Sequence, residues 1–303
     1  CHPRVDSCTD DGIALSFAPA AALGCQKQGG WASLLRRKQA LALLLGLASW
    51  AGRPRLCAAS ARPPPSARLA HKPSAIVFLH GSGDSGKGFQ RYLQAVDGGA
   101  LLDNLAADGV VMRFPDSGIR PYRLMGGMPL SIWYDRTGLP PSSPEDAQSV
   151  ESSVKYLAGI LADLKAEGIP PQRIVVGGFS MGGGIALQLA LRHPEDLGGA
   201  FVLSSYMCDD AAAYRIVKDS KRTSWPSILM AHGEADDFIR FEWGRATAQR
   251  LEDLGVLVHF ESLRGVRHEL ALGEINILSE WLKGILGPRG ESGSGSNDAT
   301  GEL

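Results

Sequence analysis

Short apolar runs that alternate with longer segments of helical periodicity constrain the fold of this chain more than any other feature. The runs are too short for helices and rich in Val, Ile and Phe, which is typical of buried strands. They cover residues 75–79, 110–114, 174–176, 200–203, 228–231 and 257–260. The helical patterns cover residues 90–107, 144–167, 181–192, 241–254 and 269–286. This alternation predicts an α/β fold with a mostly parallel central sheet and helices on both faces.

The predicted helix over residues 144–167 has its own start signals. Pro144 suits the first turn of a helix, and Ser143 precedes it as a candidate N-cap. Asp146 would then lie in the positive field of the helix N-terminus. Sheets of this class place their sites at the carboxyl ends of the strands, so the loops there are the candidates for chemistry.

The residues before the first apolar run differ in composition from the rest of the chain. Residues 12–71 contain no Asp or Glu but carry eight Lys and Arg residues. The apolar stretch 40–51 within them is too short to span a bilayer as a helix. We expect residues 1–71 to be a targeting segment, secretory or organellar, or an artefact of the gene model. Residues 72–287 then form one domain, and the Gly- and Ser-rich residues 288–303 form a disordered tail.

Charge and cysteine usage exclude other classes of protein. The net charge is −1, so no global field draws the chain to nucleic acid or to anionic lipid. Four of the five cysteines lie in the first fifth of the chain, and Cys208 is the fifth. A disulfide scaffold and a structural zinc site are therefore not expected in the main domain.

A G-x-S-x-G pattern, Gly178-Phe179-Ser180-Met181-Gly182, follows the third apolar run directly. It also opens the helical pattern at 181–192, and this strand–turn–helix context is the one that a nucleophile elbow requires. A glycine stands two positions before and two positions after the serine, as is needed where a strand and a helix pass closely. We predict that Ser180 is a nucleophile. The alternative is an ordinary Gly-rich turn between a strand and a helix.

Asp236 and His268 follow the fifth and the sixth apolar runs. A carboxylate at a strand end can hold the tautomer of a histidine, and a loop histidine can take the proton of a serine hydroxyl. Glu234 and Asp237 are possible substitutes for Asp236, and all three acids could instead be solvated loop charges. The order Ser180, Asp236, His268 matches the order of the catalytic residues in α/β-hydrolases.

A Gly-rich segment, His80-Gly81-Ser82-Gly83-Asp84-Ser85-Gly86, follows the first apolar run. Such a turn can direct backbone N–H groups toward Ser180, where an oxyanion hole would need them. We assign the N–H groups of Ser82 and Met181 to this role. A phosphate-binding loop is the alternative, but the G-x-x-x-x-G-K-[ST] form is missing. His232, in the turn before Asp236, is expected to be a packing residue.

Five motifs in this chain stand in the order found in one known family. They are the residues 78–84, Trp133-Tyr134-Asp135, the residues 177–183, the residues 232–236 and His268-Glu269. Together they resemble the phospholipase/carboxylesterase family, which includes the acyl-protein thioesterases, and most of all its lysophospholipase-like branch. The resemblance covers about residues 72–287. It implies an α/β-hydrolase fold and a cytoplasmic serine hydrolase that cleaves carboxylic esters or thioesters.

The same resemblance assigns roles to individual residues. Ser180 would be the nucleophile, His268 the general base and Asp236 the residue that orients it, with no metal or organic cofactor. The substrate would be a small acyl ester or thioester, or an S-acylated protein, without nucleic acid or an integral membrane span. Typical acyl-protein thioesterases have Gln where this chain has Met181. The resemblance therefore supports esterase activity more than the removal of acyl chains from proteins.

Residues 115–139 form a long segment between the second apolar run and the next helical pattern. A segment of that length beside a site is often a lid or a binding wall. Among its large apolar side chains are Leu124, Met125, Met128, Ile132 and Trp133. We expect all five to bind substrate and the first four to contact the acyl chain, with core packing as the alternative. A non-catalytic ligand receptor with an intact triad is the alternative from another class, because fold and site do not guarantee turnover.

Overall fold

The computed structural model describes residues 73–139 and 143–287. These residues belong to one compact unit of the chain, Pro65–Leu303. The predicted N-terminal extension, residues 1–71, and the predicted tail, residues 288–303, lie outside the described residues. Among the helices of the described part, none is both long and apolar enough to cross a membrane.

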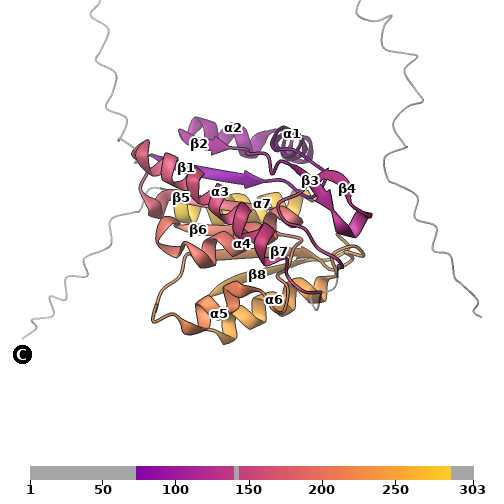
Figure 1. The fold of residues 1–303 in the computed structure, drawn as a ribbon. Coiled ribbons are helices and arrows are strands. Elements are labelled where there is room, and N and C mark those ends of the chain that lie inside the picture. The colour runs from indigo at the N-terminus through magenta and orange to yellow at the C-terminus, as the bar shows by residue number, and fades with distance from the viewer. Residues whose placement is uncertain (1–72, 140–142, 288–303) are drawn as a thin grey trace, which may run out of the picture. The chain divides into compact units, whose positions relative to one another are not determined.

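The centre of the fold is a six-stranded sheet with the order β2-β1-β5-β6-β7-β8 (Figure 1). Its strands are β1 (Ser74–Leu79), β2 (Val110–Arg113), β5 (Ile174–Phe179), β6 (Gly199–Leu203), β7 (Ser227–Gly233) and β8 (Val258–Leu263). Every neighbouring pair is parallel, which confirms the predicted fold class. The chain passes from β1 to β2 on one side and returns to β5 on the other side of β1. In open α/β sheets, binding sites lie at such a reversal, which here is at the carboxyl ends of β1 and β5.

Helices cover both faces of the sheet (Figure 1). They are α1 (Gly86–Asp97), α2 (Ala100–Ala107), α3 (Ala147–Ala166), α4 (Met181–Arg192), α5 (Ala212–Asp219), α6 (Phe241–Asp253) and α7 (Leu272–Leu286). Alternate side chains of β1 point to opposite faces, as the pleat of a strand requires. Val77 packs in the core with α3 and α4, whereas Phe78 packs in the core with α1, α2 and α7.

Three predicted helices differ from the observed ones at their boundaries. The pattern at 269–286 begins as a helix only at Leu272. The pattern at 90–107 forms two helices, because Gly98 and Gly99 adopt φ values of 70° and 92° between them. Helix α3 begins at Ala147, three residues after the predicted proline start. Its N-cap is Asp146, whose carboxylate accepts a hydrogen bond from the Ser149 N–H at 3.0 Å. This cap replaces the expected one at Ser143, because it satisfies a free N–H of the first turn.

The segment 115–139 contains a β-hairpin rather than only a loop. Strands β3 (Ile119–Tyr122) and β4 (Met128–Ser131) pair antiparallel and lie outside the main sheet. The Gly83 N–H, in the loop after β1, donates to the carbonyl oxygen of Ser131 at 2.7 Å. This bond ties the hairpin to the loop at the carboxyl end of β1. The short helix α5 was also not predicted.

Candidate active site

Ser180 lies in the turn between β5 and α4, in a strained backbone conformation. Its φ is 54° and its ψ is −124°, which is rare for a residue other than glycine. Backbone hydrogen bonds hold it there: the Ser180 N–H donates to Leu203 at 2.9 Å, and its carbonyl oxygen accepts from Gly183 at 3.0 Å. A serine in a strained strand-to-helix turn has the local geometry of a nucleophile elbow.

The glycines on either side of Ser180 are required by the neighbouring strand. A Cβ atom at Gly178 would lie 2.2 Å from the carbonyl oxygen of Leu79, and one at Gly182 would lie 2.1 Å from the same atom. Both distances are far shorter than a van der Waals contact, and the obstacle is backbone. The close passage of β1 therefore explains why this elbow has glycine at both positions.

Three side chains from distant parts of the sequence form one chain of hydrogen bonds. The Nε2 atom of His268 lies 3.0 Å from the Ser180 Oγ, and its Nδ1 atom lies 2.8 Å from Asp236 Oδ2. Asp236 follows β7 and His268 follows β8, at the carboxyl edge that β5 shares. Since a carboxylate only accepts hydrogen bonds, Nδ1 carries the proton and Nε2 is free to accept the serine proton.

The environment of Asp236 keeps its carboxyl group ionised. Burial would by itself raise the pKa of Asp236, but hydrogen bonds from His232, His268 and the Ile239 backbone hold that pKa well below its ordinary value. Its Oδ1 atom accepts from the backbone N–H groups of Phe238 at 3.0 Å and Ile239 at 2.8 Å. A fixed negative charge beside His268 stabilises the imidazolium that forms when the ring takes a proton.

The other two acids of this turn point elsewhere. Glu234 accepts a hydrogen bond from the Ser262 hydroxyl at 2.9 Å, and Asp237 pairs with Arg267; both acids are exposed. Of the three candidates, the structure thus brings Asp236 to His268. His232 is buried, as expected of a packing residue, but its Nε2 atom also lies 3.5 Å from Asp236 Oδ2. The sequence analysis did not predict this contact. The spacing of four residues between His232 and Asp236 was a signal that could have indicated it.

The loop after β1 lies against the elbow. A Cβ atom at Gly81 would lie 3.5 Å from the Cβ of Ser180. Among the residues that the structure describes, the backbone N–H groups of Ser82 and Met181 donate to no protein acceptor. The Met181 N–H also lies at the positive end of α4. Two free donors from neighbouring elements can hold an oxyanion that develops beside Ser180.

Buried hydrogen bonds fix the loop that carries Ser82. Burial lowers the pKa of His80, so its ring is neutral at pH 7. Its Nδ1 atom donates to the carbonyl oxygen of Gly81 at 2.7 Å, and its Nε2 atom accepts from the Ser117 N–H at 3.1 Å. The Trp133 indole N–H donates to the His80 carbonyl oxygen at 2.8 Å. A loop held in this way presents its N–H groups without reorganisation, as electrostatic catalysis requires.

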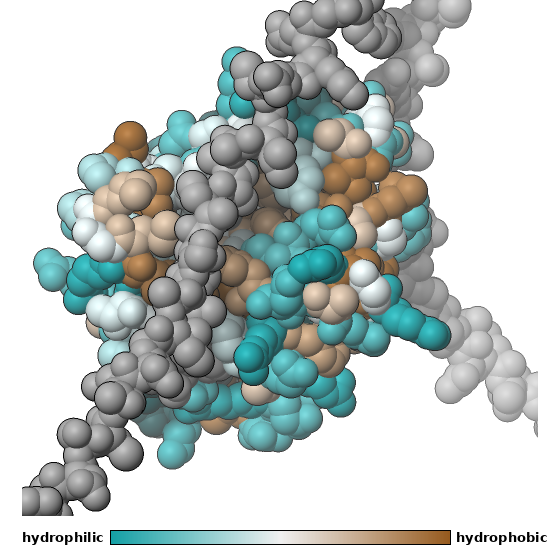
Figure 2. All heavy atoms as spheres, turned by 90° about the vertical axis from the view of Figure 1, so that its right-hand side faces the viewer, coloured by the Kyte–Doolittle hydropathy of each residue, from teal (hydrophilic) through white to brown (hydrophobic). Residues whose placement is uncertain are grey.

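The five side chains predicted to bind substrate divide into two groups. Ile132 and Trp133 are fully buried in the core shared with α3 and α4, so in this conformation they offer no surface to a ligand. Leu124 is partly buried, and about half of the surface of Met125 and of Met128 is exposed. Figure 2 looks at the right-hand side of Figure 1, where the hairpin lies, and apolar residues gather in patches among hydrophilic ones there.

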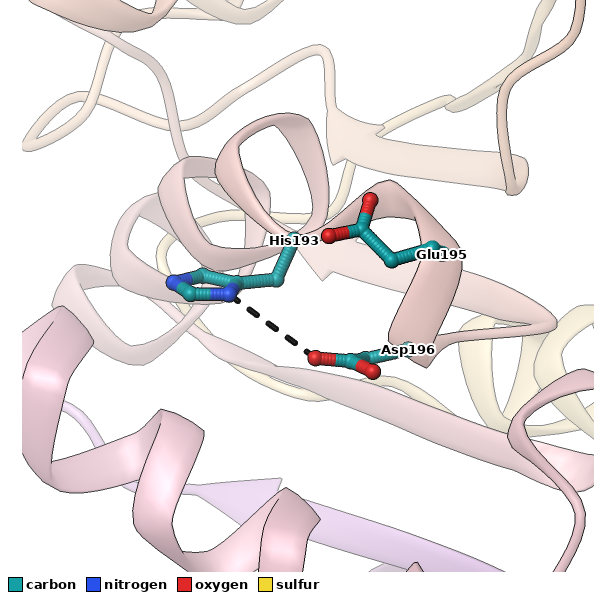
Figure 3. A group of neighbouring side chains, drawn as sticks. All are labelled: His193, Glu195 and Asp196. Carbon is teal, nitrogen blue, oxygen red and sulfur yellow. Dashed lines mark ion pairs between the residues drawn. The ribbon is translucent and has the colours of Figure 1, made fainter.

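One group in the described part of the chain has the residue types of a metal site. The ligand atoms of His193, Glu195 and Asp196 lie within 4.8 Å of one another (Figure 3). Both carboxylates already have cationic partners, because Lys165 lies 2.5 Å from Asp196 and Arg222 lies 3.1 Å from Glu195. The group also follows the C-terminus of α4, the helix whose N-terminus adjoins the elbow. It therefore has no part in the candidate active site.

The chain is similar to known proteins in its sequence. The family model described as Phospholipase/Carboxylesterase matches residues 66–286. Lysophospholipase-like protein 1 of Mus musculus is 34% identical over 209 residues, which are 69% of this chain and 85% of the relative. Acyl-protein thioesterase 1 homolog 1 of Dictyostelium discoideum is 29% identical over 215 residues, 70% of this chain and 90% of the relative.

A solved structure extends the likeness to the fold. The crystal structure of Arabidopsis thaliana SOBER1 has a TM-score of 0.63 and 27% identity, and the match covers 71% of this chain and 99% of that chain. The parallel sheet and the helices on its two faces are accordingly those of an α/β-hydrolase fold. The chain belongs to the phospholipase/carboxylesterase family.

Proposed function

We propose that this chain is a serine hydrolase that cleaves carboxylic esters or thioesters through an acyl-enzyme on Ser180. The observation that carries the proposal is the pair of hydrogen bonds, 3.0 Å and 2.8 Å long, that joins Ser180, His268 and Asp236. Membership of the phospholipase/carboxylesterase family supports the same reaction class.

Acylation begins when the Ser180 hydroxyl attacks the acyl carbon of the substrate. His268 Nε2 takes the hydroxyl proton, while Asp236 stabilises the resulting imidazolium. The carbonyl oxygen becomes an oxyanion and accepts hydrogen bonds from the N–H groups of Ser82 and Met181. The removal of one such donor costs about 3 kcal/mol of transition-state stabilisation. His268 then donates its proton to the departing alcohol or thiol, and the acyl group stays on Ser180.

Deacylation repeats these steps with water as the nucleophile. His268 takes a proton from the water as the oxygen attacks the acyl carbon, and then returns a proton to Ser180 Oγ as the acid leaves. The same Nε2 atom moves the proton in every step. The mechanism therefore depends on the 3.0 Å contact between His268 Nε2 and Ser180 Oγ.

The acyl chain is proposed to lie against the hairpin between β3 and β4. Leu124, Met125 and Met128 offer apolar surface there, and methionine side chains adapt to chains of different length. Replacement of Met125 and Met128 with Ser should shift the preference among acyl lengths. An unchanged preference would contradict this placement. The substrate is proposed to be a small ester, a small thioester or an S-acylated protein.

Covalent labelling together with turnover tests the proposed function. The full chain should react with a fluorophosphonate probe and hydrolyse p-nitrophenyl acetate and an acetyl thioester. Ser180→Ala should lose both properties, whereas Ser262→Ala, at an exposed serine, should keep both. A wild-type chain that neither reacts with the probe nor turns over either substrate would overturn the proposal. That result would favour a non-catalytic receptor.

A further inference from the structure

The imidazole of His268 contacts two phenyl rings of different exposure. Its centroid lies 4.8 Å from that of Phe179 and 5.1 Å from that of Phe238, with interplanar angles of 33° and 49°. Phe179 is buried, with 9% of its surface exposed, whereas 44% of the surface of Phe238 is exposed. A bound molecule beside His268 can therefore reach the ring of Phe238.

The backbone of Phe238 is fixed although its ring is exposed. Its N–H donates to Asp236 Oδ1 at 3.0 Å, and the next N–H, of Ile239, donates to the same oxygen at 2.8 Å. The adjacent Asp237 pairs with Arg267, so the loop after β7 is joined to the loop that carries His268. A ring on a fixed backbone loses less conformational entropy when a ligand covers it than a ring on a mobile loop.

The chemistry of the triad brings the leaving group to the imidazole that Phe238 contacts. In the proposed mechanism, His268 Nε2 gives its proton to the departing oxygen or sulfur, which must lie within about 3 Å of that nitrogen. The substituent on the departing atom then extends from the edge of the imidazole. Because Phe238 lies against the same imidazole, an apolar substituent there can cover the exposed ring and remove it from water.

We propose that Phe238 forms the apolar wall of a leaving-group subsite, and that the chain prefers esters and thioesters whose departing alcohol or thiol is aromatic. This inference rests on the proposed function and names the class of leaving group for the same site. The neighbouring Asp237 and Arg267 neutralise each other, so this pair gives a charged leaving group no net attraction. Phe238 is a specificity-determining residue in this account.

A substrate series with one acyl group and different leaving groups tests the proposal. The full chain, Phe238→Ala and Phe238→Leu are compared on methyl acetate and 2-naphthyl acetate. Phe238→Ala should lower kcat/KM about tenfold for 2-naphthyl acetate and less than about twofold for methyl acetate, in line with the value of an aromatic contact. Phe238→Leu, which keeps apolar volume, should lose about threefold on 2-naphthyl acetate. Ile216→Ala, at an exposed apolar residue of α5, is the matched control and should change neither.

The outcomes separate this inference from the proposed function. A loss of the same size on both esters would overturn the subsite, because it would mean that Phe238 acts on the imidazolium alone. Unchanged kinetics on both esters would also overturn it, while wild-type turnover would leave the proposed function standing. Fluorophosphonate labelling of each variant tests whether its Ser180 is still reactive. A wild-type chain with no labelling and no turnover would remove the proposed function and this inference together.

Discussion

Glu274 places a carboxyl group in the interior of the protein, in the first turn of α7. Only 1% of its surface is exposed, and neither carboxylate oxygen makes a hydrogen bond of normal geometry with another described residue. Burial raises the pKa of Glu274 from its ordinary 4.5 to about 8; the nearby Ala271 N–H opposes this rise and the charge of Asp236 adds to it. The carboxyl group is therefore protonated in the folded protein at pH 7.

The raised pKa couples folding to pH. Between pH 4.5 and pH 8 the folded state holds a proton at Glu274 that the unfolded state releases. The raised pKa of Glu274 thus makes its full contribution to the free energy of unfolding below pH 4.5. This contribution is lost as the pH rises through about 8. At roughly 1.4 kcal/mol per pH unit, the full loss is about 5 kcal/mol.

Glu274→Gln keeps the size of the side chain but removes its ionisation. The free energy of unfolding, measured in urea from pH 5 to pH 9, should be similar for the two proteins at pH 5. At pH 9 the variant should be more stable by several kcal/mol, up to about 5. Glu269→Gln, at an exposed glutamate, is the matched control and should show no such divergence. Parallel stability curves for wild type and Glu274→Gln would refute the reasoning.

Three further substitutions test the site and its support. Asp236→Asn should lower kcat about 10⁴-fold in steady-state assays at pH 7, because an amide holds the wrong tautomer of His268; a loss below tenfold would contradict the orienting role. Gly182→Ala should destabilise the fold by about 3 kcal/mol or more, measured by urea unfolding, because its Cβ would lie 2.1 Å from the Leu79 carbonyl oxygen. Gly159→Ala, in α3 with open space around it, should instead stabilise the protein by about 0.5–1 kcal/mol. Equal effects at the two glycines would mean that the close passage of β1 is not limiting.

The four inner strands of the sheet, β1, β5, β6 and β7, were predictable because parallel strands buried on both faces are continuous apolar runs. The ends of the strands were less visible in the sequence. Strand β5 continues to Phe179 through two glycines, Gly177 and Gly178, which pair with β1 and β6 although they carry no side chain. Hydrophobic periodicity detects side chains, so it ended this strand too early.

The hairpin was missed for a related physical reason. Pro121 and Pro129 lie opposite each other in β3 and β4, and proline disfavours an interior strand because it lacks an N–H donor. These strands pair only with each other in the described structure, so the usual rule for sheet interiors does not apply. Sequence patterns do not show which strands lie at an edge.

The candidate site was predicted from the order and spacing of a few polar residues. Ser180 was identified by its strand–turn–helix context, which is local in sequence. The choice of Asp236 over Glu234 depended on which carboxylate reaches His268, and the folding of the loop after β7 decides this. The burial of Trp133 was not predictable, because an apolar residue in a loop has the same pattern whether it packs in the core or faces a ligand.

The covalent intermediate offers the most direct test of the central claim. The full chain is mixed with a p-nitrophenyl ester, quenched in acid within one turnover and analysed by peptide mass spectrometry. We expect one acyl group on the peptide that contains Ser180, and none in Ser180→Ala, which should also lack turnover. Ester hydrolysis that continues at the wild-type rate in Ser180→Ala, or an acyl group found on another residue, would contradict the account.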